Sequence, residues 1–335
     1  MKALVTGGGG FLGGAIVRQL VKRGDEVKSF SRGEYPFLNE LGVNHIKGDV
    51  ADTNALCSAA EGCDVVFHVA AKAGDWGPYD VFYRTNVEGT MNVIDACKTA
   101  SVSRLVFTSS PSVVFNGGDM ENVDESVSYA EHFDAAYPAT KAIAEQAVLK
   151  ANGRDLATVA LRPRLIWGPG DNNLFPRLAE RARTGMLCIV GTGENLLDIC
   201  YIGNAAKAHV QAADKLYKGS PLAGNAYFVS DGTPQPLEKV VNMMLKAYGL
   251  SPIRRHVPFR IAYCAAWLLE TIYRTLALKG EPVVTRFVVK EMVSSVWFNL
   301  SAAGKDFGYV PEISFEEGYK ILSESLASNR RSISG

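Results

Sequence analysis

The sequence predicts an α/β protein with a doubly wound parallel sheet and a smaller C-terminal lobe. Short apolar segments alternate with helix-like segments four to five times over residues 1–170, as in sheets whose parallel strands are joined by helices. A glycine-rich stretch, Thr6 to Gly13, lies between the first apolar segment and the first helical one. Phosphate-binding turns occupy that position in Rossmann-type folds. We therefore expect a Rossmann-type sheet followed by a substrate lobe.

The length and charge of the chain agree with this class. A chain of 335 residues is long enough for one large α/β domain with a smaller lobe, or for two compact domains. Its 35 basic and 35 acidic residues are interspersed, so no nucleic-acid tract or polybasic membrane patch is indicated. A small molecule is the partner that this composition favours.

The six cysteines and five histidines form no metal-binding pattern. No C-x-x-C pair and no zinc spacing occurs, so we expect no metal site. The cysteines are expected to be buried thiols in a reducing cytosol. Because the chain begins directly with a strand, no cleaved secretion signal is expected, and a cytoplasmic location follows.

The glycine-rich stretch joins a strand at residues 1–5 to a helix at residues 11–21. Its glycines allow two registers, Gly8-x-Gly10-x-x-Gly13 and Gly7-x-x-Gly10-x-x-Gly13. In such a turn, backbone N–H groups and the helix N-terminus can face a pyrophosphate. The alternative is a glycine-rich turn without a ligand, but the strand and helix around it favour a dinucleotide site.

The second strand, residues 26–32, indicates which dinucleotide the chain binds. The residue at its end meets the adenosine ribose, where an acid binds the 2′-hydroxyl of NAD and an arginine can accept the 2′-phosphate of NADP. Here Ser31 and Arg32 stand at this point and no carboxylate does. NADP is therefore favoured. The alternative is a solvated Arg32 in an enzyme that takes NAD or both.

The remaining elements of the first domain follow in order. Residues 44–50 predict a third strand that runs into Asp49, and residues 53–60 a helix capped by Asp52 or Thr53. Residues 64–71 form a nearly continuous apolar strand, in which His68 is expected to be a core histidine. A long helix is expected at 79–100, a strand at 104–108, a surface excursion at 116–134, a helix at 136–150 and a strand at 158–162.

Beyond residue 170 the pattern is less regular. We expect helices at 174–184, 204–217, 237–248 and 314–326, a short strand at 197–202, and a strand near 226–230 that returns to the main sheet. The predicted domains are thus 1–170 with that returning strand, a mainly substrate-binding lobe at 171–327, and a disordered tail at 328–335.

One lobe segment, residues 261–278, is apolar over about 18 residues and is interrupted by Glu270 and Arg274. A membrane span needs about 20 mostly uncharged residues, so this segment is not expected to span one. We expect a helix that covers the substrate pocket. The alternative is a peripheral contact with a membrane or a lipid-handling partner.

Three side chains carry the chemical prediction. Tyr137 and Lys141 are four apart on one helix face, and a phenol with a pKa of about 10 becomes a better base beside an ammonium group. Ser110, which follows a strand, can donate a hydrogen bond to a carbonyl oxygen. An acid/base group and a polarising donor around one C–O bond suit hydride transfer. A surface Tyr/Lys pair and a helix-capping serine are the alternatives.

The chain resembles the extended short-chain dehydrogenases/reductases over about residues 1–230. The resemblance rests on the Thr6–Gly13 turn, Gly48-Asp49-Val50, Ala70-Ala71, Asn86-Val87-x-Gly89-Thr90, Ser109-Ser110, Tyr137-x-x-x-Lys141, and Leu161-Arg162-Pro163 followed by Gly168-Pro169-Gly170. It implies Ser110, Tyr137 and Lys141 as catalytic residues. It implies a cofactor site made of Gly7, Gly10, Phe11, Leu12, Gly13, Ser31, Arg32, Asp49, Val50, Ala70, Ala71, Asn86, Tyr137, Lys141 and Pro163.

Three features narrow the resemblance: the Thr108–Phe115 segment, the segment Ser31-Arg32-Gly33-x-Tyr35-Pro36, and the apolar helix of the C-terminal lobe. With these, the chain is most similar to the 3β-hydroxysteroid dehydrogenase-like branch, which includes sterol-4α-carboxylate 3-dehydrogenases and 2-alkyl-3-oxoalkanoate reductases. Pro111 and Ser112 stand where sugar dehydratases carry an Asp-Glu pair, which argues against elimination chemistry. The resemblance implies an NADP-preferring oxidoreductase that interconverts a ketone and a secondary alcohol on an apolar substrate, either a long-chain 2-alkyl-3-keto acid or a 3-keto or 3β-hydroxy steroid carboxylate.

The sequence leaves two alternative functions open, and the resemblance also implies an oligomeric state. A nucleotide-sugar epimerase could use the same scaffold, and a non-catalytic NADP sensor is the alternative of another class. A homodimer through the helices at 79–100 and 137–150 is expected from the resemblance.

Overall fold

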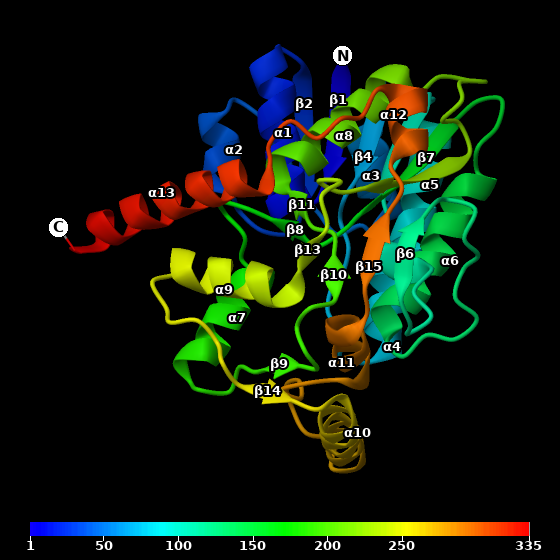
Figure 1. Cartoon of the computed structure of the whole chain (residues 1–335). Helices are drawn as coiled ribbons and strands as arrows, with labels where there is room; N and C mark the ends of the chain where they lie inside the picture. The colour runs from blue at the N-terminus through cyan, green and yellow to red at the C-terminus, as the bar shows by residue number, and fades with distance from the viewer. Residues whose placement is uncertain (335) are drawn as a thin grey trace.

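A seven-stranded, fully parallel sheet forms the centre of the molecule (Figure 1). The computed structural model describes residues 1–334, with side chains described up to Ser328. The strand order is β12-β7-β5-β4-β1-β2-β3, which confirms the predicted class, including the returning strand. The strands are β1 (Lys2–Thr6), β2 (Glu26–Ser31), β3 (Asn44–Lys47), β4 (Val65–His68), β5 (Arg104–Thr108), β7 (Ala157–Pro163) and β12 (Asn225–Val229).

Helices cover both faces of this sheet, which explains why its central strands are apolar on both sides. One face carries α1 (Phe11–Arg23) and α8 (Ile202–Lys215), and the other carries α3 (Thr53–Ala60), α5 (Gly89–Thr99) and α6 (Ala136–Lys150). Asp52 caps α3, since its side chain accepts from the Ala55 N–H. The short α2 (Pro36–Glu40) lies between β2 and β3.

The long helix expected at 79–100 is interrupted by one wide turn. It consists of α4 (Tyr79–Tyr83), the π-helical turn η1 (Arg84–Glu88) and α5. Such turns are rare and are frequently found at functional sites. Here the wide turn carries Asn86, and its role is described with the site below. The expected homodimer through this helix stays a prediction.

A second, four-stranded sheet was not expected. It contains β13 (Gln235–Pro236), β10 (Leu196–Leu197), β15 (Val296–Phe298) and β6 (Met120–Val123). The excursion at 116–134 is therefore not wholly irregular, because β6 pairs with β15 from the far end of the chain. The strand expected at 197–202 is split into β10 and β11 (Cys200–Tyr201), and β11 pairs with β8 (Ile166–Trp167). Phe298 stacks on Phe228 of β12 with centroids 4.0 Å apart, which joins the two sheets.

The lobe contains α7 (Leu174–Arg183), α9 (Leu237–Ala247), α10 (Phe259–Thr275) and α11 (Arg286–Val293), with the two-stranded sheet of β9 (Ile189–Val190) and β14 (His256–Val257). The chain then returns through α12 (Ser301–Phe307) to α13 (Phe315–Ser334). Buried Leu322 anchors α13 in the main core, and the helix continues past Ser328, where a disordered tail was expected to begin. Gly335, the last residue of that tail, lies outside the described residues.

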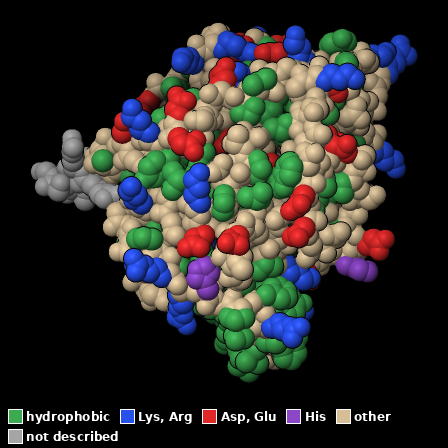
Figure 2. Space-filling view, in the orientation of Figure 1, with side chains coloured by type: hydrophobic (Ala, Val, Ile, Leu, Met, Phe, Trp, Pro, Cys, Tyr) green, Lys and Arg blue, Asp and Glu red, His purple; other side chains and the backbone are tan. Residues whose placement is uncertain are grey.

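Helix α10 is the apolar segment singled out in the sequence, but it does not cover the pocket directly. It packs through Ala262 and Ala266 against Val289 of α11, and α11 forms the pocket wall. On its outer side Ile261, Trp267 and other apolar side chains are exposed, and Figure 2 shows apolar atoms gathered over this helix. None of the helices within residues 1–334 has the length and hydropathy that a membrane span requires. A peripheral lipid contact here stays a prediction.

The cysteines are less uniformly buried than expected. Cys63, Cys97 and Cys200 are buried, Cys57 and Cys188 are half-buried, and Cys264 is exposed on α10. Cys264 is exposed because it lies on the solvent side of an amphipathic helix whose small residues face α11.

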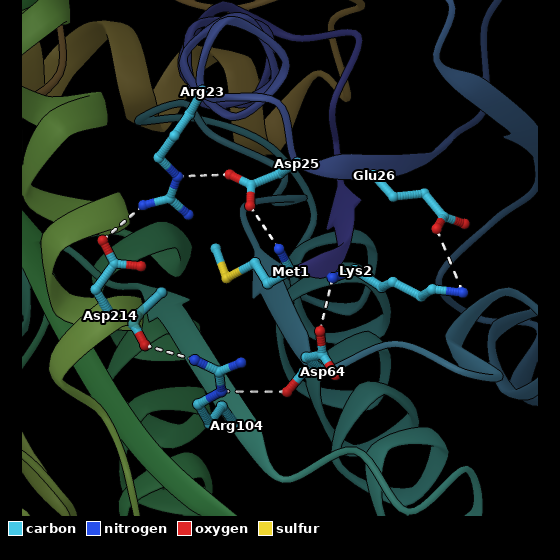
Figure 3. A network of polar contacts seen from close by, with 9 residues as sticks. Met1, Lys2, Arg23, Asp25, Glu26, Asp64, Arg104 and Asp214 are labelled. Carbon is cyan, nitrogen blue, oxygen red and sulfur yellow. Dashed lines mark hydrogen bonds and ion pairs between the residues drawn. The ribbon is translucent and has the colours of Figure 1, made fainter.

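A network of charges ties the amino ends of the strands together, at the edge opposite the glycine turn (Figure 3). The Met1 ammonium group donates to Asp25 Oδ1 at 2.7 Å. Arg23 bridges Asp25 and Asp214 at 2.6 Å to each, which connects the end of α1 to α8. Because the side chains of Arg23 and Asp214 are 36% and 44% exposed, their pair stabilises the fold by less than about 1 kcal/mol.

A buried ion pair between α6 and β7 matters more for the stability of the fold than these exposed pairs do. Arg162 donates from Nε and Nη2 to the two carboxylate oxygens of Glu145, at 3.0 and 2.6 Å. The Tyr129 hydroxyl donates to the same carboxylate at 2.7 Å. The exposed fractions of the two charged side chains are 4% and 0%, so removing either partner leaves a desolvated charge.

We predict that Glu145→Ala lowers the free energy of unfolding by about 3–5 kcal/mol, because the Arg162 charge would stay buried without its partner. Urea denaturation measures this. The control is Glu34→Ala, which removes the exposed pair of Glu34 with Lys47 and should cost less than about 1 kcal/mol. Equal small losses in both variants would contradict the prediction.

Candidate active site

A cavity of about 510 Å³ opens at the carboxyl ends of β1, β4, β5 and β7. The strand order reverses between β1 and β4, and ligands of open α/β sheets bind at such a reversal. The cavity is lined by all but one of the predicted site residues: Gly7, Gly10, Phe11, Leu12, Gly13, Ser31, Arg32, Asp49, Val50, Ala70, Ala71, Ser110, Tyr137, Lys141 and Pro163.

The glycine turn forms one wall of the cavity. Gly7 has a φ of +71°, in the left-handed region that favours glycine. At Gly13 an added Cβ would lie 2.1 Å from the Gly7 carbonyl oxygen, so only glycine fits. Gly10 caps α1 without any side-chain hydrogen bond, which leaves N–H groups of the first turn free for an anion. The conformation of Gly7 favours the Gly7, Gly10, Gly13 register.

The end of β2 forms the next part of the wall. Ser31 Oγ accepts a hydrogen bond from the Gly9 N–H at 3.2 Å, so it braces the glycine turn. Arg32 is exposed at the rim and also lines the cavity. Tyr35 was not predicted to belong to this site, yet its ring lies so close to Gly9 that a Cβ on Gly9 would come within 2.2 Å of it. No spacing rule connects a loop tyrosine to that glycine.

Asn86 is the one predicted cofactor-site residue that does not line the cavity. It is buried in the π-helical turn, where its Oδ1 accepts from the Lys72 N–H at 2.8 Å. Its Nδ2 donates to the Lys72 carbonyl at 3.1 Å and to Thr140 Oγ1 at 3.0 Å. Asn86 therefore joins the loop after β4 to α6. It supports the wall of the cavity without lining the cavity itself.

His68, at the end of β4, is a core residue as predicted. Its Nδ1 lies 2.7 Å from Thr6 Oγ1 and its Nε2 lies 3.0 Å from Thr90 Oγ1. Burial lowers the pKa of His68 to about 3, and the charge of Lys141 acts in the same direction. The imidazole is therefore neutral and links two structural hydroxyls.

Ser110 and Tyr137 meet in the centre of the cavity. Ser110 Oγ lies 2.9 Å from Ser112 Oγ and accepts from the Ser112 N–H at 3.2 Å. Burial raises the pKa of Tyr137; a hydrogen bond with Ser110 lowers this pKa and the charge of Glu291 raises it further. The phenol is thus protonated at neutral pH and can act as a proton donor.

Lys141 does not lower the pKa of Tyr137 in the way its spacing suggested. Its ammonium group donates to the Thr108 carbonyl at 2.5 Å and lies 3.9 Å from the Phe107 ring centre. Burial lowers the pKa of Lys141 to about 7, and the charge of Glu145 opposes that change. The expected lowering at Tyr137 is therefore wrong here, because burial raises the pKa of Tyr137 while the Lys141 ammonium group is directed to the Thr108 carbonyl.

The far side of the cavity comes from the lobe and from the chain after β7. Leu165 and Leu174 give it apolar surface, and α11 adds Phe287 and Glu291. Arg164 lies between these two parts and pairs with Glu291 at 3.0 Å. The α11 residues could not be predicted from the sequence, because a separation of more than 120 residues leaves no local pattern to connect them with Arg164.

Comparison with known proteins adds to this geometry. A model of the 3-beta hydroxysteroid dehydrogenase/isomerase family matches residues 4–259. The chain is 50% identical over 330 residues to the 2-alkyl-3-oxoalkanoate reductase of Stenotrophomonas maltophilia (strain K279a), covering 98% of this chain and 100% of that protein. It is 33% identical over 335 residues to the sterol-4-alpha-carboxylate 3-dehydrogenase, decarboxylating, of Mus musculus, covering 98% and 92%. The crystal structure of gox2253 superposes with a TM-score of 0.78 at 26% identity and 98% coverage of each chain.

We predict that Gly13→Ala weakens the binding of a nicotinamide dinucleotide roughly tenfold or more. The new methyl group would force the turn away from the Gly7 carbonyl, at a strain of about 1–3 kcal/mol. Fluorescence titration measures the affinity. The control is Gly153→Ala, where the nearest atom to an added Cβ is 3.9 Å away. Unchanged affinity in the Gly13 variant would show that the turn does not hold the dinucleotide.

Proposed function

Because the chain belongs to the 3-beta hydroxysteroid dehydrogenase/isomerase family and is an oxidoreductase, we propose that it is an NADP-preferring ketoreductase acting on a long-chain 2-alkyl-3-keto acid. The observation that carries this proposal is the meeting of Ser110, Tyr137 and Lys141 with the glycine turn in one cavity. A hydroxyl donor and a protonated phenol beside a dinucleotide site suit the reduction of a carbonyl group.

The cavity fits a nicotinamide dinucleotide, since Gly7, Gly10 and Gly13 line it without side chains and no side-chain hydrogen bond caps the first turn of α1. When bound, the dinucleotide supplies or accepts the hydride. Gly7, Gly10 and the first turn of α1 would hold its phosphates. Ser31 and Arg32 would meet the adenosine ribose.

The chain's own groups move the proton. In the reductive direction Tyr137 gives its proton to the substrate oxygen, which Ser110 holds by a hydrogen bond. Because the pKa of Tyr137 is raised, the phenol keeps this proton at neutral pH until it passes to the substrate oxygen. The ammonium form of Lys141 then offsets the negative charge left on the phenolate, and Glu145 favours that form because its charge raises the pKa of Lys141.

The substrate class rests on the relatives and on the cavity wall. The relative named 2-alkyl-3-oxoalkanoate reductase is 50% identical and the sterol relative 33%. Leu165, Leu174 and Phe287 offer apolar surface to an alkyl chain. Apolar contacts discriminate by only about 1–3 kcal/mol per methylene, so we also expect slow turnover of 3-ketosteroids.

We predict that Tyr137→Phe lowers the turnover of 2-alkyl-3-keto acids about 10²–10⁴-fold, because the proton donor is lost. The affinity for NADPH should stay nearly unchanged. Oxidation of NADPH followed by absorbance measures the first quantity, and fluorescence titration the second. The control is Tyr79→Phe at an exposed position. A Tyr137 variant that keeps most of its activity would overturn the mechanism, and tight binding of UDP without ketone reduction would favour an epimerase.

We predict that Arg32→Ala raises the KM for NADPH about tenfold, as expected for loss of a hydrogen-bonded charge, and changes the KM for NADH little. The matched control is Lys22→Ala, which removes an exposed charge at the far end of α1. Steady-state kinetics with both cofactors measures the change. Equal effects on both cofactors would show that Arg32 does not recognise a 2′-phosphate.

A further inference from the structure

Arg164 is a buried cation in the cavity wall that the chemistry above does not use. It follows β7 directly, and its N–H donates to the Val229 carbonyl at 2.9 Å, which fixes its backbone beside β12. Its exposed fraction is 5%. It lines the same cavity as Ser110 and Tyr137.

The hydrogen-bond capacity of Arg164 is only partly used. Nη1 donates to Glu291 Oε1 at 3.0 Å, whereas Nε is buried and has no partner among the residues that the structure describes. Its neighbour Arg162 also has one buried nitrogen, Nη1, without a partner among the described residues, but its Nε and Nη2 hold both oxygens of one fully buried carboxylate. A buried guanidinium group with a free donor is costly unless an acceptor meets it.

The partner of Arg164 is also less fixed than the partner of Arg162. Glu291 belongs to α11 of the lobe, and its side chain is 20% exposed. A single bond to a partly exposed carboxylate leaves room for a second anion, because a guanidinium group offers five donors in a fork that matches a carboxylate. The nearby Asp198 makes no hydrogen bond to Arg164 among the described residues: its Oδ2 accepts from Ser230 and from the Phe298 N–H, its Oδ1 has no partner, and the charge of Arg164 lowers its pKa against the effect of burial.

We propose that Arg164 binds the carboxylate of the substrate, and this proposal rests on the proposed function. In a 3-keto acid the carboxylate is one carbon away from the carbonyl group that Ser110 and Tyr137 hold. An anion-binding group must then lie in the same cavity as these two residues. Arg164 lines that cavity, and it pairs with Glu291, whose charge acts on Tyr137. Its ligand class is therefore a carboxylate with a carbonyl group at the 3-position.

Glu291 then has a specificity role. Its charge pairs with Arg164 and repels an incoming carboxylate, so it competes with the substrate for the same donors. Arg164 and Glu291 together would set the preference for the acid over a neutral ketone of the same shape. The apolar wall alone cannot make this distinction.

The experiment compares a 2-alkyl-3-keto acid with its methyl ester. In Arg164→Met we expect the ratio of kcat/KM for acid to that for ester to fall about 10- to 100-fold, as for loss of a charge-assisted hydrogen bond. In Glu291→Gln, which keeps the shape of the side chain, the same ratio should rise. Equal losses for acid and ester in the Arg164 variant, or a fall in the ratio in the Glu291 variant, would overturn the proposal.

A binding measurement separates this proposal from the ketoreductase function. A 2-alkyl carboxylate without the keto group and its methyl ester are titrated calorimetrically into the wild type and the Glu291→Gln variant. Preferential binding of the acid, increased in the variant, supports the anion site even if no ketone is reduced. Equal affinity for acid and ester in the wild type overturns it while the ketoreductase function can still hold.

Discussion

The buried fork between Glu145 and Arg162 is the interaction on which the site most depends. Tyr137, Lys141 and Glu145 are each four residues apart and so share one face of α6. By binding both oxygens of Glu145, Arg162 fixes that face against β7. The same strand leads to Pro163 and Arg164. This buried ion pair therefore joins the helix face that carries Tyr137 to the strand that leads to Arg164.

Desolvation governs the charges that face the substrate. Burial raises the pKa of Tyr137 and lowers the pKa of Lys141 to about 7, so both groups tend toward their neutral forms. Glu145 opposes this change at Lys141, because its charge raises the pKa of that group. Glu291 acts in the same direction as burial at Tyr137, whose pKa its charge raises further, and its carboxylate also pairs with Arg164.

The lobe reaches the cavity through α11 and presents α10 to the outside. Glu270 of α10 binds the Arg286 N–H at 2.7 Å and its side chain at 2.8 Å, which joins the two helices. Thr285 donates to Asp75 at 2.8 Å and Lys290 to Asp134 at 2.6 Å. These contacts hold α11 over the cavity from both sides. The apolar outer face of α10 is therefore separate from the pocket that it was expected to cover.

Local patterns in the sequence determined the sheet, the glycine turn and the Ser110, Tyr137 and Lys141 set. Strand alternation, a turn between strand and helix, and a four-residue helical spacing are all short-range features. The resemblance placed Asn86 in the cofactor site. It did not predict that Asn86 supports the cavity wall without lining the cavity, because its partners Lys72 and Thr140 lie on other elements.

Only the tertiary structure decided the rest. The pairing of β6 with β15, the approach of Tyr35 to Gly9 and the meeting of Arg164 with Glu291 join residues that no local period connects. The protonation of Tyr137 belongs here too. Spacing placed an ammonium group one turn away, yet the pKa follows from burial, and burial is a property of the packed molecule.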